Sequence, residues 1–333
     1  MEKLNYKQLR TDARAAVAGF GNTAVKLIAI HAGFSIGANF LLALINYLLE
    51  MGIAQTGGLS GIGTRAILET VQQVLQTTLT LALPFWAMGY TFAALQMARG
   101  KSADSVNLLT GFRHLGSVLR TNILRYVIYF ALMMLGAQIA CYIFMLTPAA
   151  RALMAVMEEM LATMESSETL DYVALLNNEA YMQAMLPAMP YMLVGALLPL
   201  IPFLYRLRMM DFALMDDPRK GAFHAFAQSM RMTRKNCLAI FKLDLHFWWY
   251  HGLYLLIFLV GNYGADAAAY FSLPVPADTA QLILTLVCAV CMLALFWWRK
   301  NEVSVAYAHA FDILHAPPKE TPRPAPKNQP WNY

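Results

Sequence analysis

The side chains with the strongest capacity for chemistry lie together in FKLDLHFWWYHGL, residues 241–253. This stretch carries Lys242, Asp244, His246 and His251 within a largely apolar region. Ionisable groups buried in a membrane are costly and often line a substrate path or a proton relay. Asp244 and His251 are seven residues apart, so a continuous helix would place them on one face, where a His–Asp pair can pass protons.

A structural interpretation of the same residues competes with the chemical one. Lys242 can extend its side chain until the ammonium group reaches the membrane surface, while Asp244 pairs with an arginine of a nearby loop. The aromatic residues that follow His246 would then pack in the core or against lipid. We favour this structural interpretation, and we keep Asp244, with Lys242, His246 and His251, as the candidate intramembrane polar site.

A second candidate region is RKGAFHAFAQSMRMTRK, residues 219–235. Helical spacing places its larger apolar side chains on one face: Phe223, Phe226, Ala227 and Met230. The cations that could contact lipid headgroups lie mostly elsewhere: Arg219, Lys220, Arg231, Arg234 and Lys235. A basic amphipathic helix of this kind suits the surface of an anionic inner leaflet. A helix packed against the rest of the bundle explains the pattern equally well, and the sequence leaves both interpretations open.

Metal and cofactor chemistry finds little support. Asp216 and Asp217 could ligate a metal together with His224, but an aspartate directly before a proline is more typical of a helix start. Cys288 and Cys291 form a C-x-x-C motif among aliphatic residues, whereas redox and zinc sites need polar surroundings and further ligands. No phosphate-binding loop, nucleophile elbow, zinc-protease helix or dinucleotide fingerprint is present. We expect no metal and no cofactor, and we leave enzymatic activity uncertain, leaning against it.

Long apolar helices must position these candidate sites. The chain of 333 residues is 59% hydrophobic and only 14% charged, whereas soluble domains carry about 25% charged residues. Crossing a bilayer takes about 20 mostly apolar residues. Six stretches qualify: 25–49, 75–97, 121–147, 188–207, 237–261 and 279–298. The predicted fold class is therefore all-α, a polytopic transmembrane helix bundle of about six spans.

Prolines predict irregular helices in two of these stretches. Proline removes a backbone donor and kinks helices. The fourth stretch and the residue before it hold Pro187, Pro190, Pro199 and Pro202, so we expect it to be bent or broken. Pro84 gives the same expectation for the second stretch.

The distribution of cations predicts the orientation. Of the 25 Lys and Arg residues, twenty fall at the N-terminal end, in 98–120, in 206–235 and after 298, whereas only Arg65 and Arg151 fall in the alternate connections. Lys and Arg are retained in cytoplasmic loops. We therefore expect a multi-pass protein of the bacterial cytoplasmic (cell) membrane with both termini in the cytoplasm.

The predicted organisation follows from these stretches. Residues 1–20 form a cytoplasmic basic amphipathic helix, 21–315 the six-span domain, and 316–333 a proline-rich cytoplasmic tail without fixed structure. Within the six-span domain, 148–186 form a small acidic helical insert outside the membrane. Residues 206–236 form a basic cytoplasmic loop with an interfacial helix.

Partners follow from the same distribution. The net charge of +5 is spread between apolar runs, unlike the concentrated basic face of nucleic-acid binders, so we expect no nucleic acid. The expected partners are the lipid bilayer, with anionic lipids of its inner leaflet, and a protein partner or a second copy of the chain. Two functions stay open: a non-enzymatic role in membrane organisation, assembly or partner binding, or transport of a small solute or ion past Asp244 and the fourth span.

Several stretches resemble one family of bacterial membrane proteins. LRTDARAAVAG near the start, GYTFAALQMARGKSADSVNLLTGFRHLG at residues 89–116, and AYAHAFDIL near residue 310 are similar to elements of the DUF975 family of uncharacterised integral membrane proteins. The longest similarity covers residues 200–250, with an Asp-x-Pro element followed by a helix and LDLHF. His246 stands where the family commonly has serine. The resemblance implies a multi-helix bundle in a bacterial cytoplasmic membrane, and it implies no catalytic residues.

Overall fold

The chain folds into helices joined by short turns. The computed structural model describes residues 5–55, 59–164, 179–270 and 277–316, and these ranges contain helices and no strands. The all-α expectation is therefore confirmed for the part of the chain described. The predicted tail, 316–333, and the middle of the acidic insert, 165–178, lie almost wholly outside it.

Five helical segments are long and apolar enough to cross a membrane, and a bent helix pair would make six. The five are α2 (Asn22–Gln55), α3 (Leu59–Ala98), α5 (Leu115–Met145), α9 (Ala188–Leu207) and α14 (Ala277–Leu295). They coincide with five of the six predicted stretches. Such an all-helical architecture is that of a membrane protein.

The sixth predicted stretch is not one helix. Residues 237–261 divide into α12 (Cys237–His246) and the first part of α13 (Trp248–Tyr270), which are bent by 70° at Phe247. The helices are not broken at their prolines, since α3 continues through Pro84 and α9 continues through Pro199 and Pro202. A long helix keeps its remaining backbone hydrogen bonds around one missing donor, so a proline need not break it.

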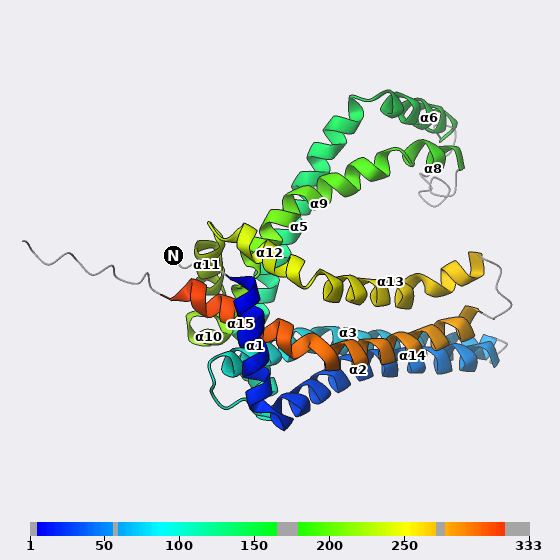
Figure 1. The fold of residues 1–333 in the computed structure, drawn as a ribbon. Coiled ribbons are helices and arrows are strands. Elements are labelled where there is room, and N and C mark those ends of the chain that lie inside the picture. Colours follow the sequence, from blue (N-terminus) through cyan, green and yellow to red (C-terminus); the bar gives the residue numbers. More distant parts are fainter. Residues whose placement is uncertain (1–4, 56–58, 165–178, 271–276, 317–333) are drawn as a thin grey trace, which may run out of the picture. The chain divides into compact units, whose positions relative to one another are not determined.

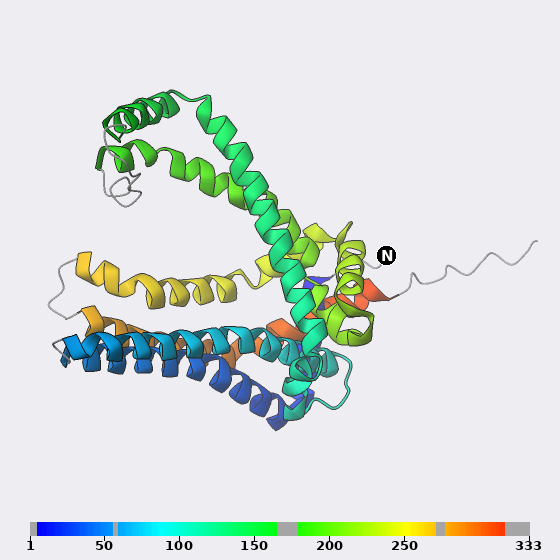
Figure 2. The same ribbon diagram turned by 180° about the vertical axis from the view of Figure 1, so that it is seen from behind.

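The chain divides into two compact units, residues 1–121 with 209–333 and residues 122–208. In the first unit, α2, α3 and α14 run side by side and α13 packs against α14 (Figures 1 and 2). In the second unit, the end of α5 packs with α9, and α6 (Pro148–Met164) packs with α8 (Glu179–Met185). Both α6 and α8 lie within the insert that was expected to be helical.

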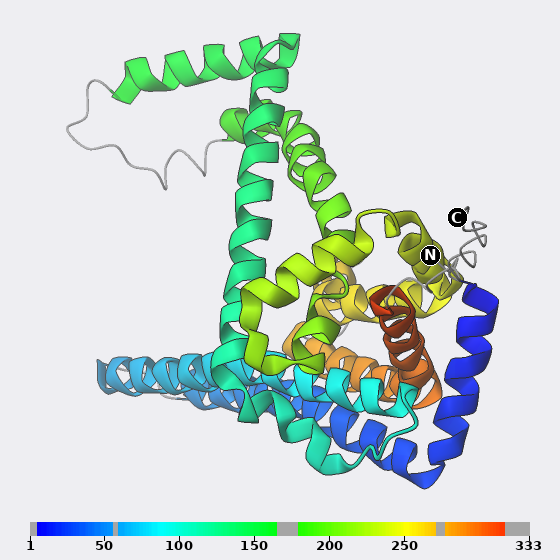
Figure 3. The ribbon, with the colours of Figure 1, turned by 90° about the vertical axis from the view of Figure 1, so that its left-hand side faces the viewer.

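Shorter helices gather at one end of the long helices of the first unit. They are α1 (Tyr6–Phe20), η1 (Ser105–Leu109), α4 (Thr110–Arg113), α10 (Met210–Asp216), η2 (Pro218–Lys220), α11 (Gly221–Thr233) and α15 (Asn301–His315). Helix α15 is the centre of this group, since ten of its residues are buried. Helix α1 lies against α15 and runs across the direction of the long helices (Figures 1 and 3).

Two glycines allow η1 and α4 to pack directly on α3. A Cβ atom on Gly89 would lie 1.8 Å from the carbonyl oxygen of Leu108, and one on Gly111 would lie 1.9 Å from that of Phe85. Only glycine permits such an approach of backbone to backbone. The loop after α3 is therefore held tightly against the helix that it leaves, which fixes the position of the residues at the end of α3.

Candidate functional site

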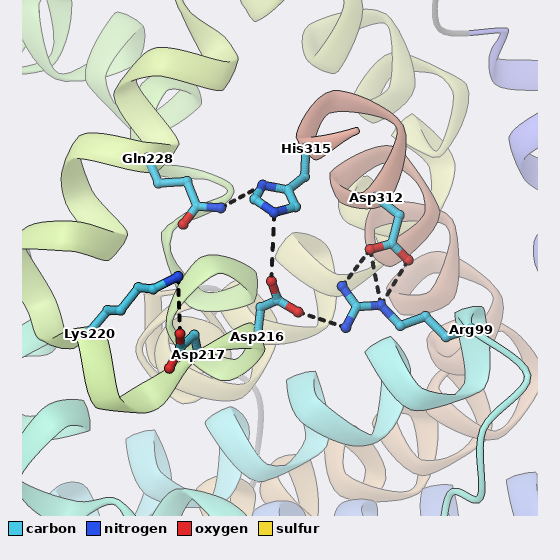
Figure 4. A network of polar contacts seen from close by, with 7 residues as sticks. All are labelled: Arg99, Asp216, Asp217, Lys220, Gln228, Asp312 and His315. Atoms are coloured by element: carbon cyan, nitrogen blue, oxygen red, sulfur yellow. Dashed lines mark hydrogen bonds and ion pairs between the residues drawn. The ribbon is translucent and has the colours of Figure 1, made fainter. Parts of the chain in front are cut away.

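Arg99 directly follows α3 and joins three helices. Its Nη1 donates to Asp216 Oδ1 of α10 at 2.6 Å, and its Nη2 donates to Asp312 Oδ1 of α15 at 2.6 Å. Its Nε lies 3.1 and 3.2 Å from the two carboxylate oxygens of Asp312. Figure 4 shows the guanidinium group held between the two carboxylates. The fork of donors on arginine suits this bidentate arrangement, which a lysine could not reproduce.

The network continues from Asp216 to α11. His315 of α15 contacts both α11 and α10. Its Nδ1 lies 2.7 Å from Gln228 Nε2 of α11, and its Nε2 lies 4.0 Å from Asp216 Oδ2 of α10 (Figure 4). Beside it, Lys220 forms an ion pair with Asp217 at 3.1 Å. The network thus adds α11 to the helices that Arg99 joins.

The pKa values of two groups in this network are shifted. Hydrogen bonds to Asp312 raise the pKa of Arg99 above its ordinary value, burial opposes them, and Asp216 adds to the rise. The hydrogen bond from Lys220 lowers the pKa of Asp217. Asp217 directly precedes Pro218 of η2, as expected for a helix start, but its side chain pairs with Lys220 and does not cap the 3₁₀ turn.

A second ionic cluster surrounds Glu302, whose side chain is only 6% exposed. Arg10 and Arg14 of α1 reach its Oε1 at 2.8 and 3.1 Å, and Arg299 pairs with its Oε2. Arg10 and Arg14 are four residues apart and therefore share one face of α1. One carboxylate thus fastens α1 to α15.

The structure places Asp244 within a small polar group. Tyr307 of α15 donates a hydrogen bond to Asp244 Oδ1, and His251 Nε2 lies 3.7 Å from the same oxygen. Tyr307 Oη is also 3.5 Å from His251 Nε2. Asp244 and His251 therefore lie close together, but not on one face of a continuous helix as predicted, because the helix is broken at Phe247. A carboxylate, an imidazole and a phenol in contact could pass a proton, and they could equally fix the bend between α12 and α13.

The other two residues of the predicted intramembrane site lie elsewhere. The ring of His246 lies 6.5 Å from that of Tyr6 on α1 and 5.9 Å from that of Phe247. Lys242 is exposed. Sequence reasoning did not indicate Tyr307, the contact of Asp244 on the distant helix α15.

The basic loop has two different faces. Helix α11 buries small residues and its C-terminal end, namely Ala222, Ala225, Ser229, Met232 and Thr233, and it packs on α10. The face predicted to be apolar stays accessible, and Phe223 is 77% exposed. The five predicted headgroup cations, Arg219, Lys220, Arg231, Arg234 and Lys235, are all exposed. The helix therefore packs on α10 with one face and leaves Phe223 and Ala227 of its other face exposed.

Buried polar contacts also join the long helices α2 and α3 to α15. Tyr90 Oη donates to Asn301 Oδ1 at 2.6 Å, and Asn301 Nδ2 donates to the carbonyl oxygen of Ala24 at 2.9 Å. His31 stacks on Tyr90 with 4.1 Å between ring centroids. Asn301 follows a five-residue π-helix, η3 (Phe296–Lys300), which connects α14 to α15. These contacts tie α2, α3 and α15 together.

Sequence reasoning missed the two ionic clusters, but signals for part of them were present. Arg10 and Arg14 have the spacing of a helical pair, and Glu302 is an isolated acid beside Arg299 and Lys300. Arg99, by contrast, was interpreted only as a marker of orientation. The described residues contain no group of three or more His, Cys, Asp or Glu side chains that could hold a metal ion.

Comparison with known proteins adds no relative. No family model matches the chain, and no curated protein or solved structure does either. The residues and geometry described above must therefore carry the functional argument.

Proposed function

We propose that the chain is a six-span protein of the bacterial cytoplasmic membrane with both termini in the cytoplasm. Five apolar helices, with the bent pair α12 and α13 as one further span, would supply six crossings. The cationic connections, including those of α11 and the end of α3, would lie together on the inner side. The helices around α15 would then form a cytoplasmic assembly, and α6 and α8 would lie outside. The resemblance to the DUF975 family agrees with this arrangement, and membership of that family is part of the proposal.

Within this arrangement the protein has a non-enzymatic role in membrane organisation, assembly or partner binding. One observation carries the proposal: charged side chains at the ends of the long helices are used to fasten helices to one another. Arg99 joins α3, α10 and α15, and Glu302 joins α1 to α15. A rigid assembly with exposed cations on either side of α11 suits recognition of another molecule better than it suits turnover of a substrate.

A second candidate function is transport of a small ion. It is favoured by the contact of Asp244, His251 and Tyr307, because such a group could exchange protons with a permeating ion. Asp244 is mostly buried, with 18% of its side chain exposed, whereas 38% of the His251 side chain is exposed.

Substitution of Asp244 separates the two functions. The Asp244→Asn variant keeps the size and the hydrogen-bond acceptor that faces Tyr307 but removes the charge. The purified full chain and this variant would be reconstituted into vesicles, and proton and cation flux would be measured under imposed gradients. The proposed role predicts no flux above empty vesicles for either protein.

Flux through the unchanged protein that the Asp244→Asn variant abolishes would replace the proposed role with transport. Lys101→Gln, which removes a charge from an exposed loop, is the matched control for nonspecific charge effects. The topology is tested separately by alkylation of single cysteines placed in 150–164 and 219–235. Labelling of both regions from the same side would contradict the six-span arrangement.

A further inference from the structure

Three guanidinium groups converge on the single carboxylate of Glu302. Arg10 and Arg14 of α1 both contact its Oε1, at 2.8 and 3.1 Å, and Arg299 contacts its Oε2. These four side chains, hereafter the arginine cluster, therefore combine three positive charges with one negative charge. Arg99 shows the opposite balance, because its one guanidinium group is held between two carboxylates.

Most hydrogen-bond donors of the arginine cluster have no partner among the described residues. Arg10 and Arg14 reach Glu302 through Nε alone, and the Nη groups of both donate to no described residue. Arg299 donates through Nη1, whereas its Nε is buried and also lacks a partner within the described chain. A buried donor without an acceptor is costly. The oxygens of a carboxylate or a phosphate suit such donors best.

Hydration does not resolve the imbalance of charge. Water can accept hydrogen bonds from accessible Nη groups, but it carries no charge. Guanidinium groups held around one carboxylate repel one another, and a single arginine is enough to pair Glu302 with α1. The second and third arginines therefore add positive charge that the ion pair itself does not need.

The nearest other acids do not balance the arginine cluster. Asp12, the other acid of α1, is two residues from Arg10 and from Arg14, so it lies on the opposite side of the helix, where it acts on His309. Helices α5 and α9 contain no Asp or Glu, and all the acids of residues 122–208 lie between 158 and 179. In the proposed topology that segment is outside the membrane. A ligand can supply the second anion that these residues do not.

The position of the arginine cluster indicates the kind of anion. Arg299 follows the end of α14 at Leu295, and its guanidinium carbon is 4.9 Å from the centre of the Trp298 ring. Tryptophan beside arginine is typical of the level of the lipid headgroups. In the proposed topology this level belongs to the inner leaflet, where anionic lipids carry phosphates. The fork of donors on arginine matches two phosphate oxygens at once.

We propose that Arg10, Arg14 and Arg299 bind the phosphate group of an anionic ligand, and that Glu302 positions them. The contacts that define this site lie within the first unit, so the site does not depend on the membrane arrangement. Its assignment to a lipid headgroup does rest on the proposed function, and it names the ligand of the proposed recognition role. A soluble phosphate is the other source of the same chemistry.

Calorimetric titration measures the binding. The full chain is purified in a neutral sugar detergent and titrated at constant ionic strength with short-chain phosphatidylglycerol, short-chain phosphatidylcholine and inorganic phosphate. A headgroup site predicts saturable binding of phosphatidylglycerol, weaker binding of phosphatidylcholine, whose choline group is cationic, and no binding of inorganic phosphate. Saturable binding of inorganic phosphate would instead identify a soluble phosphate as the source. Binding of neither anion, or equal affinity for the two lipids without binding of inorganic phosphate, would overturn the proposal.

Substitution of Arg14 links the binding to the arginine cluster. The Arg14 side chain is 49% exposed, against 28% for Arg10 and 20% for Arg299, so its loss disturbs the packing least. Arg14→Gln should weaken binding of the anion by at least about tenfold, which corresponds to one charge-assisted hydrogen bond. Arg14→Lys keeps the charge without the fork and should weaken it less.

The matched control is Arg113→Gln, which removes the same charge from an exposed position of α4 and should keep the affinity. An unchanged affinity of Arg14→Gln would contradict the proposal. An equal loss in Arg14→Gln and Arg113→Gln would do the same, because the effect would then come from net charge.

Modification of arginines by phenylglyoxal tests the site without any substitution, so a variant that fails to fold does not prevent the test. In the unchanged protein, the bound anion should slow the reaction of Arg14 and leave that of Arg113 unaltered, as measured by mass spectrometry of peptides. Equal rates at Arg14 with and without the anion would refute the site. Cysteine alkylation separates this failure from a failure of the six-span topology, since binding in detergent does not depend on sidedness.

Discussion

Replacing Arg99 with alanine should loosen α10 and α15 from α3. The variant leaves two carboxylates facing each other in a space that the guanidinium group filled. The side chains of Arg99, Asp216 and Asp312 are 23%, 22% and 30% exposed, so the pairs are neither fully buried nor at the surface. Breaking a fully buried pair costs about 3–5 kcal/mol, whereas exposed pairs contribute up to about 1 kcal/mol. We expect a coupling energy of about 2 kcal/mol between Arg99 and Asp312.

Hydrogen exchange measures this energy locally. In the full chain in mild detergent, a loss of about 2 kcal/mol would lower the protection of amides in α15 by about 30-fold. The Arg99→Lys variant keeps the charge but cannot bridge both carboxylates, so its protection should fall between those of the unchanged protein and Arg99→Ala. Exchange in α6, which belongs to the other unit, serves as the internal control and should not change.

A double-mutant cycle of Arg99→Ala and Asp312→Ala isolates the pair. The double variant should be little worse than either single variant, because each substitution alone leaves a group without its partner. Additive effects, with a coupling below about 0.5 kcal/mol, would refute the idea that this ion pair holds the helices together.

Three further predictions follow from the same contacts. Gly111→Ala should destabilise the first unit by about 2 kcal/mol or more, because a Cβ would meet the Phe85 carbonyl oxygen at 1.9 Å. The control is Gly116→Ala, since nothing lies within 4 Å of a Cβ at that position. Equal thermal stability of the two variants would contradict this prediction. Tyr90→Phe should cost about 1–3 kcal/mol in denaturant unfolding, since it leaves the buried Oδ1 of Asn301 without its donor; an unchanged midpoint would show that this bond adds nothing. The pKa of Asp217 is lowered mainly by Lys220. The pair therefore stabilises the fold at pH values above the unfolded-state pKa of the carboxyl group, and this stabilisation is lost as the pH falls through the folded-state pKa. The melting temperatures of the unchanged protein and Lys220→Gln should converge in acid, and a constant difference at every pH would count against the pairing.

The long helices were predictable because their signal is large. A run of about 20 mostly apolar residues is what a helix needs to span a bilayer. Five of the six stretches predicted from this rule are helices at nearly the expected positions. The break at Phe247 could not be predicted in the same way. The residues around it, LDLHFWWYH, contain no proline or glycine before Gly252. Asp244, close to the break, contacts Tyr307 of the distant helix α15, and the local sequence does not report such a contact.

The candidate site was predictable only where its partners are close in sequence. Asp244 and His251 are only seven residues apart, and they lie 3.7 Å from each other across the bend at Phe247. Glu302 and Arg10 are separated by 292 residues, and nothing in the sequence matches one to the other. A cation at the end of an apolar stretch is expected from membrane topology alone, so the position of Arg99 in the sequence does not indicate that it pairs with Asp216 and Asp312.

The central place of α15 has a consequence for how the protein is made. Helices α1 and α3 leave the ribosome long before α15, so Arg10, Arg14 and Arg99 have to wait for Glu302 and Asp312 while the intervening helices are inserted. During that interval the early helices can pack against lipid and against one another, but the group of short helices around α15 is incomplete. The group of short helices is therefore completed only when α15 is made, and a chain stopped after α14 would leave Arg10 and Arg14 without Glu302 and Arg99 with Asp216 alone.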